Sequence, residues 1–135
     1  MAGYSSTPLF KKLGYQSEFR VLVVNTPEHY FDWIEGHPDT VGFFQKGKDL
    51  NLIHYFETTL SSLYKKLPSL KERITQNGMI WVSWPKKSSG VKTDITEDEI
   101  RKLALSIGLV DIKVCAVSEV WSALKLVIPV SSRKN

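Results

Sequence analysis

Two kinds of apolar pattern alternate along this chain. Apolar runs without alternation at residues 19–25 and 79–84 predict strands buried on both faces, which is typical of a parallel sheet. Shorter apolar runs at residues 41–44 and 51–56 predict two more strands. After the third strand, apolar residues recur at helical spacing and predict a helix, which Pro68 splits or kinks. These apolar residues are Leu60, Leu63, Leu67, Leu70 and Ile74.

Residues that commonly begin and end helices frame the other helical segments. A capping box formed by Thr96 and Glu99 predicts the start of one helix, and Gly108 predicts its end. Two shorter helices are predicted, one near the N-terminus and one at residues 28–35. Their framing residues are Thr7, Pro8 and Gly14 for the first, and Thr26, Pro27, Gly36 and Pro38 for the second.

The last part of the chain predicts a hairpin. Asn77 and Gly78 indicate a turn before the fourth strand. Residues 112–117 and 121–128 predict two final strands, separated by the short span expected of an antiparallel hairpin. Strands that alternate with helices and end in a hairpin predict an α/β fold, a three-layer sandwich around a mostly parallel sheet.

The composition is that of an ordinary globular domain. The 135 residues are 42% hydrophobic and 24% charged, and the net charge of +4 is too small to indicate a dedicated nucleic-acid-binding protein. The single cysteine, Cys115, is expected in the core and fits a reducing cytoplasm. No apolar run approaches the roughly 18 residues of a spanning helix, so we expect no membrane partner. We expect one domain over residues 1–135, with a helical strap at 1–18 and a loose tail at 131–135.

The succession of elements resembles a known fold family. Strand and helix units closed by a hairpin, with the segment GMIWVSWP at residues 78–85 before the last helix, resemble the class I methyltransferase-like Rossmann fold. The resemblance covers about residues 20–130 and lacks one strand–helix unit of that fold. It implies a sheet of about six strands in the order 2-1-3-4-6-5.

Four segments are similar to a family of small bacterial proteins known as domain-of-unknown-function family number 3052. The resemblance spans the chain and implies no particular activity. The segments are AGYSSTPL at 2–9, NTPE at 25–28, WVSWPKK at 81–87 and WSALKLV at 121–127.

The methyltransferase resemblance implies a cofactor site that this sequence departs from. Enzymes of that fold hold S-adenosylmethionine with a glycine-rich turn after the first strand and an acidic residue at the end of the second. Here the first strand is followed by residues 25–29, NTPEH, in which Pro27 lacks an amide N–H. The second strand ends in Gln45 and Lys46. We therefore expect no cofactor.

Ligands of such sheets bind at the carboxyl ends of the strands, and polar residues gather there. We expect a small anionic ligand or a protein partner at this edge, with no catalytic residue. The candidate residues are Asn25, Thr26, Glu28, His29, His54, Trp84, Lys86, Lys87, Ser88 and Lys92. The three histidines lack metal-ligand spacing, so we expect no metal.

Several of these residues have a second interpretation. His54 could face Glu28 or His29 and act as an acid or base, or it could be a hydrogen-bonded edge histidine. The loop from Trp84 to Glu99 could hold an anion, or it could be solvated and mobile, since its three lysines meet four carboxylates. Trp84 could pack in the core or form a ligand wall or a subunit contact, which would permit a homodimer.

Three functions are compatible with the sequence. The leading hypothesis is a cytoplasmic, non-catalytic module that binds a ligand or a protein. The second is a reduced methyltransferase-like enzyme that uses His54 or Glu28 as its base. The third is weak binding of nucleic acid, although the lysines are too scattered to favour it.

Overall fold

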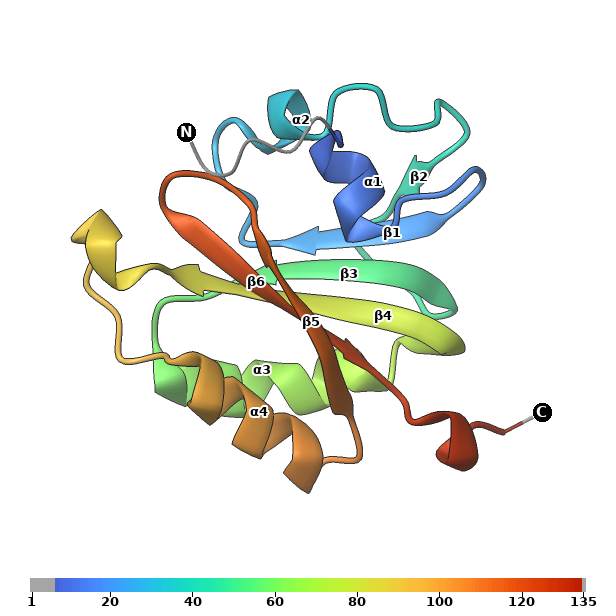
Figure 1. Ribbon diagram of the computed structural model, residues 1–135. Coiled ribbons are helices and arrows are strands. Elements are labelled where there is room, and N and C mark those ends of the chain that lie inside the picture. The colour runs from blue at the N-terminus through green and yellow to red at the C-terminus, as the bar shows by residue number, and fades with distance from the viewer. Residues whose placement is uncertain (1–6, 135) are drawn as a thin grey trace.

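The architecture is a single six-stranded sheet between two layers of helices (Figure 1). The computed structural model describes residues 7–134. Its strands are β1 (Arg20–Val24), β2 (Gly42–Phe43), β3 (Leu50–Phe56), β4 (Ile74–Pro85), β5 (Val110–Ala116) and β6 (Trp121–Val127). The strand order is β2-β1-β3-β4-β6-β5. The first four strands are parallel, and β6 is antiparallel to both β4 and β5, so the predicted order and terminal hairpin are confirmed.

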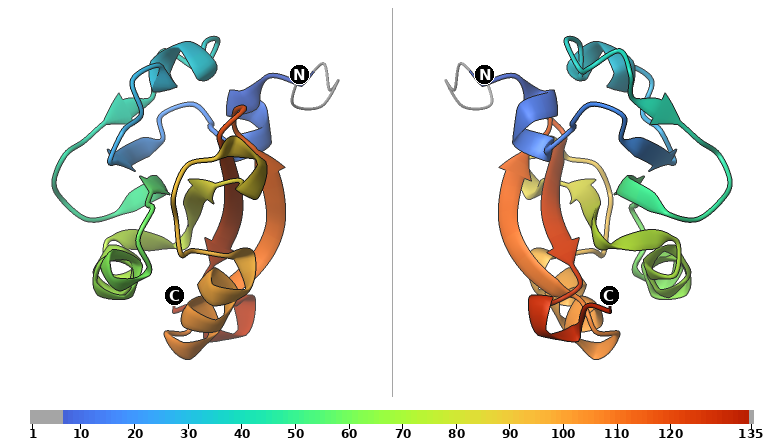
Figure 2. Two further views of the ribbon diagram at one scale, coloured as in Figure 1. Left: turned by 90° about the vertical axis from the view of Figure 1, so that its left-hand side faces the viewer. Right: turned by 90° about the vertical axis from the view of Figure 1, so that its right-hand side faces the viewer.

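The helices divide between the two faces of the sheet. The short helices α1 (Leu9–Leu13) and α2 (Tyr30–Trp33) cover one face, and α3 (Leu60–Lys71) and α4 (Glu97–Ser106) cover the other, as Figures 1 and 2 show. This is the predicted three-layer arrangement. Two single turns of 3-10 helix complete the list, η1 (Lys87–Ser89) and η2 (Val130–Ser132).

Each face of the sheet has its own core, and β3 contributes to both. Ile53 and Tyr55 belong to the apolar cluster under α3 and α4. Leu52 and Phe56 belong to the cluster under α1 and α2, and His54 shares their face by alternation. Because both faces of this strand are buried, its sequence lacks the apolar–polar alternation of a half-exposed strand.

The prediction of a turn at Asn77 and Gly78 is wrong. Both residues lie inside β4, at an irregularity where Leu50 pairs with Ile74 but Leu52 pairs with Met79. A β-carbon at position 78 would lie 2.9 Å from the Leu50 carbonyl oxygen, so this close approach of two strands requires glycine. The dipeptide marks a bulge here, and the same residues favour turns and bulges alike.

Other helix boundaries differ in detail from the sequence pattern. The helix α3 ends at Lys71, so Ile74 belongs to β4, and Pro68 lies within the helix without splitting it. The capping box is confirmed, because the Glu99 amide donates to Thr96 Oγ1 over 3.2 Å. Near the N-terminus, the N-cap of α1 is Pro8.

The two chain ends are only partly described. Residues 1–6 of the expected strap and residue 135 of the expected tail lie outside the described residues, as does most of the resemblance segment at 2–9. In the tail, η2 is followed by Arg133, whose Nε donates to the Ile128 carbonyl over 2.9 Å. Among residues 7–134, no helix is both long and apolar enough to cross a bilayer.

Candidate functional site

The side chain of Asn25 joins the carboxyl ends of two neighbouring strands. Asn25 directly follows β1 and has a left-handed backbone with φ of 58°. Its Nδ2 donates to the Phe56 carbonyl at the end of β3 over 2.8 Å. Asparagine tolerates this backbone better than most residues, which explains its place at the exit of the strand. The Asn25 side chain therefore joins the end of β1 to the end of β3.

Glu57 anchors the start of α3. Its Oε1 accepts a hydrogen bond from the Tyr55 hydroxyl over 2.6 Å, and its Oε2 accepts from the amides of Thr58 and Thr59 over 3.0 and 3.3 Å. Burial and the carboxylate of Glu57 raise the pKa of Tyr55, so this phenol stays protonated. The amides of the two residues that precede α3 are thereby satisfied by a carboxylate of the chain itself.

A second carboxylate completes this helix start. Asp94 Oδ1 accepts from the Leu60 amide over 2.7 Å, and the Thr93 hydroxyl donates to the Thr58 carbonyl over 2.6 Å. The loop before α4 is thus tied to the start of α3.

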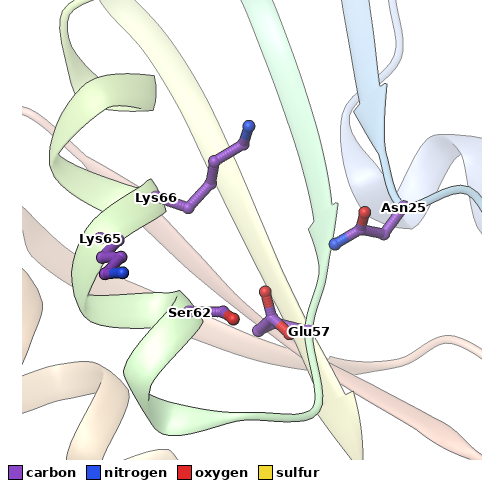
Figure 3. Close-up of a pocket in the computed structure, with 5 residues that line it drawn as sticks. All are labelled: Asn25, Glu57, Ser62, Lys65 and Lys66. Atoms are coloured by element: carbon purple, nitrogen blue, oxygen red, sulfur yellow. The ribbon is translucent and has the colours of Figure 1, made fainter.

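A cavity of about 350 Å³ lies beside these groups (Figure 3). Its lining residues are Asn25, Glu57, Ser62, Lys65 and Lys66. In Figure 3 the Ser62 hydroxyl points toward Glu57. Lys65 and Lys66 are exposed on α3, and within residues 7–134 neither lysine takes part in an ion pair. The cavity thus offers two unpaired ammonium groups and one carboxylate that is already hydrogen-bonded.

Sequence reasoning missed four of these five residues. Only Asn25 was a named candidate. The available signal was the position of Glu57 directly after a buried strand and two residues before the helix N-cap, Thr59. No sequence pattern distinguishes Lys65 and Lys66 from the other surface lysines.

Of the two interpretations of His54, the hydrogen-bonded histidine agrees with the structure, whereas a side chain that faces Glu28 or His29 does not. His54 is fully buried under α1 and α2, where its ring stacks on Phe56 at 4.2 Å between centroids. Its Nδ1 hydrogen-bonds the Tyr30 hydroxyl at 2.9 Å and its Nε2 hydrogen-bonds the Ser83 hydroxyl at 2.7 Å. Burial lowers the pKa of His54 to about 3, so the imidazole is neutral at pH 7. A sealed, neutral histidine between two hydroxyls has a structural role.

The hydrogen bonds of His54 continue through Tyr30 to Tyr15, which follows the N-terminal helix. The Tyr30 hydroxyl also contacts the Tyr15 hydroxyl at 2.7 Å, and burial raises the pKa of both phenols. Trp81 Nε1 donates to the Leu13 carbonyl over 2.7 Å and fixes the end of α1. No buried side-chain nitrogen or oxygen lacks a partner in the described part of the chain. The hydrogen-bonded row of Tyr15, Tyr30, His54 and Ser83 therefore offers no unpaired buried side-chain group to a ligand.

The candidate residues in and beside the loop after β4 lie in different surroundings. Trp84 packs in the core under α3 and α4, and Lys86 Nζ donates to the Ser118 carbonyl over 2.9 Å. Lys87 lines a cavity of about 300 Å³ beside Trp84, while Lys92 lines another of about 280 Å³ beside Thr58. Ser88 lies in the exposed turn η1. The structure therefore distributes these candidates over separate surfaces.

The start of α4 supplies its own charges. Glu97, Asp98 and Glu99 occupy its first turn, and Arg101 forms ion pairs with Glu97, Asp98 and Asp111. An external anion gains little at a helix start that already carries three carboxylates.

The remaining candidates lie on the exposed segment after β1. Thr26 lines a cavity of about 250 Å³ with aromatic side chains, among them Phe31 and Phe43. Glu28 is exposed, and His29 Nδ1 lies 3.6 Å from Asp32 Oδ2. Within residues 7–134, no group of three or more His, Cys, Asp or Glu residues could hold a metal ion.

Several solved structures share this architecture. A SAM-dependent methyltransferase from Aquifex aeolicus superposes with a TM-score of 0.66 at 11% identity, over 89% of this chain and 87% of that one. Magnesium protoporphyrin IX methyltransferase from Synechocystis gives 0.58 at 10% identity, over 88% and 77%. A protein of the NADB-Rossmann superfamily from Streptococcus agalactiae gives 0.55 at 11% identity, over 100% and 72%. The chain has a methyltransferase-like Rossmann fold.

Comparisons of sequence add no further assignment. No family model matches the chain, and no curated protein matches it. The resemblance to the small bacterial family of unknown function therefore stays a prediction.

The segment that connects β1 to β2, which we call the first crossover, does not fit S-adenosylmethionine, the cofactor that this fold implies. The turn after β1 contains the bulky Asn25, whose amide is engaged with β3, and Pro27. The cavity at the ends of β1 and β2 is lined by Val23, Thr26, Phe31, Phe43, Phe44 and Gln45. It contains no carboxylate for the ribose hydroxyls, and no glycine for close approach of the backbone.

Proposed function

We propose that this chain is a non-catalytic module that binds a small anionic ligand in the cavity lined by Asn25, Glu57, Ser62, Lys65 and Lys66. The observation that carries the proposal is a cavity at the carboxyl edge of the sheet that is lined by two exposed lysines, neither of which forms an ion pair within residues 7–134. Ligands of open α/β sheets bind at this edge. Unpaired lysines favour a carboxylate or phosphate group.

The cavity also limits the chemistry of the ligand. Glu57 contributes oxygen lone pairs beside the Ser62 hydroxyl, so a ligand with a hydroxyl or amino group next to its anionic group complements both ends (Figure 3). A volume of about 350 Å³ lies at the small end of the range of ligand sites. We infer a small hydroxy acid, amino acid or sugar phosphate as the ligand class.

The non-catalytic part of the proposal rests on the state of the possible bases. His54 is buried and hydrogen-bonded on both ring nitrogens, and the Glu57 carboxylate accepts hydrogen bonds from the amides just before α3. Glu28 remains exposed, away from the lining of the cavity. Of these three possible bases, only Glu57 lines the cavity, and its carboxylate is already held by hydrogen bonds from Tyr55, Thr58 and Thr59.

A second candidate function is a reduced methyltransferase-like enzyme. The likeness to methyltransferase structures favours it, although likeness at 10–12% identity speaks for the fold alone. The misfit of the first crossover to S-adenosylmethionine argues against it.

Titration followed by backbone NMR tests the proposal. Glycolate, serine and glycerol 3-phosphate are added in turn to the protein, with inorganic phosphate as a fourth probe. We expect at least one probe to cause saturable shifts at Asn25, Glu57 and the first two turns of α3. The double variant Lys65→Glu/Lys66→Glu abolishes these shifts, because it replaces attraction by repulsion.

A matched variant controls for net charge. Lys11→Glu/Lys48→Glu reverses two exposed lysines away from the cavity and is expected to bind like the wild type. Equal loss of binding in both double variants would show a diffuse charge effect and contradict the proposal. So would shifts that cluster at Phe31 and Phe43 instead.

A further inference from the structure

The strand β5 presents an open edge of the sheet. It lies at the end of the strand order and pairs only with β6 (Figure 2). No other strand among residues 7–134 pairs with its outer side. An unpaired edge exposes a row of backbone N–H and C=O groups that another strand can use.

On one face of β5 and β6, the charged residues of these two strands are both lysines. Lys113 on β5 lies directly opposite Lys125 on β6, and Lys125 in turn lies opposite Trp81 on β4. All three side chains are therefore on the face covered by α1 and α2. Burial lowers the pKa of Lys125, and Lys113 lowers it further. Like charges in direct cross-strand register destabilise a sheet unless a counter-charge is present.

A third lysine belongs to the same surface. Burial raises the pKa of Cys115, while the ammonium groups of Lys12 on α1 and Lys113 oppose that shift, so both lie near this thiol. Within the described residues, none of Lys12, Lys113 and Lys125 forms an ion pair. We call Lys12, Lys113 and Lys125 the lysine face of β5.

The opposite face of the edge is apolar and electrically balanced. Val114 pairs with Leu124, which lies in the core under α3 and α4, yet half of the Val114 surface is exposed. On this face the charge of Asp111 is paired with Arg101 at 3.0 Å. Successive residues of β5 thus offer a cationic surface on one side and an apolar surface on the other.

We propose that β5 binds an extended peptide segment with alternating acidic and apolar residues, which adds a seventh strand to the sheet. Its backbone pairs with the outer edge of β5. Its acidic side chains face Lys113, Lys125 and Lys12, and its apolar side chains cover Val114. This mode, addition of a strand to an open edge, takes affinity from the backbone and specificity from alternate side chains.

Charge argues for such a partner over a second copy of this chain. Pairing two β5 edges would bring two lysine faces together and add to the repulsion that already exists between Lys113 and Lys125. An irregularity between Asp111 and Lys113 also bends the edge, and bulges and lysines commonly prevent self-association. An acidic strand removes the charge obstacle and relieves the repulsion.

The experiment uses the full chain and a blocked peptide of alternating glutamate and valine, about six residues long like a common strand. Amide hydrogen exchange is measured along β5 with and without the peptide. We expect slower exchange at outward-facing amides of residues 112–116, and binding that weakens with salt. A peptide of the same length with lysine in place of glutamate is expected not to bind.

Variants separate this site from the cavity of the proposed function. Lys113→Glu is expected to weaken the peptide by about tenfold, since it turns attraction into repulsion at an exposed residue. Lys48→Glu matches its charge change and should leave affinity unchanged. Lys65→Glu/Lys66→Glu should also leave it unchanged, so either proposal can fail alone.

Four results would overturn the proposal. The first is no protection of β5 at saturating peptide, and the second is equal binding of the lysine peptide. The third is protection that grows with protein concentration in the absence of peptide, which indicates that a second copy of the chain binds at β5. The fourth is a single-stranded oligonucleotide that binds more tightly than the acidic peptide and is lost in Lys113→Glu, which indicates nucleic acid.

Discussion

His54 and Glu57 lie close together on one stretch of chain, yet their surroundings differ completely. His54 is sealed between the sheet and the short helices, with both ring nitrogens hydrogen-bonded to hydroxyl groups. Glu57 lies where β3 ends and lines a cavity open to solvent. The comparison shows that a titratable side chain on the strand and one just beyond it serve different purposes. The first stabilises the fold, and the second lines the cavity that we propose as a ligand site.

Removal of the His54 ring should produce the largest loss of stability. His54→Ala leaves a buried cavity and two hydroxyls, those of Tyr30 and Ser83, without this partner. We expect the free energy of unfolding to fall by about 4 kcal/mol. Urea unfolding measures it, and His29→Ala, at an exposed position, is the control with a change below about 0.5 kcal/mol. A small effect of His54→Ala would contradict the structural role.

The pH dependence of stability should report the same buried histidine. Its pKa is about 3 in the folded chain and 6.5 in its ordinary state, so only the unfolded chain takes up this proton between those values. Its contribution is fully present above pH 6.5. Below that, it should be lost by up to about 1.4 kcal/mol per pH unit toward pH 3.

The variant His54→Asn isolates this effect from the carboxylates. Asparagine does not titrate, so the difference in unfolding free energy between wild type and variant should shrink as the pH falls from 6.5 to 4.5. A difference that stays constant over this range would show that His54 is accessible to protons in the fold.

Truncation of Glu57 should have a smaller effect on stability. Glu57→Ala removes the acceptor of the Thr58 and Thr59 amides just before α3, and loss of such hydrogen bonds costs about 1 kcal/mol. Glu57→Gln keeps an acceptor and should lose less. Thermal unfolding compares the two variants. Equal losses would indicate that the charge, and not the hydrogen bonds, is what matters at this position.

Reversal of the two cavity lysines should barely change stability. Lys65 and Lys66 are exposed and unpaired within the described chain, so Lys65→Glu/Lys66→Glu should shift the free energy of unfolding by less than about 0.5 kcal/mol. Urea unfolding checks this. A larger loss would mean that the lysines support the fold and would weaken their assignment to a ligand.

The sequence predicted the fold better than the site, and the reason is physical. Apolar runs and capping residues act locally, so the runs at 19–25 and 79–84 and the Thr96–Glu99 box were sufficient to place β1, β4 and α4. The prediction of a turn at Gly78 failed because a bulge and a turn require the same small residue.

The candidate site depended on contacts that local patterns do not contain. Which face of β3 receives His54 follows from the register of the whole sheet, and that register places it beside Tyr30 and Ser83. The lysines of α3 approach Asn25 only because β1 and β3 are neighbours. Neither relation can be read from spacing along the chain.

Isothermal titration of the intact protein with S-adenosylmethionine tests the central claim most directly. That claim is that the first crossover, bridged by Asn25 and stiffened by Pro27, no longer holds this cofactor while the lysine cavity beside α3 remains open. We predict no binding heat up to about 1 mM, the weakest affinity of interest. Saturable binding that is weakened by a change at Thr26 and unaffected by Lys65→Glu/Lys66→Glu would contradict the account.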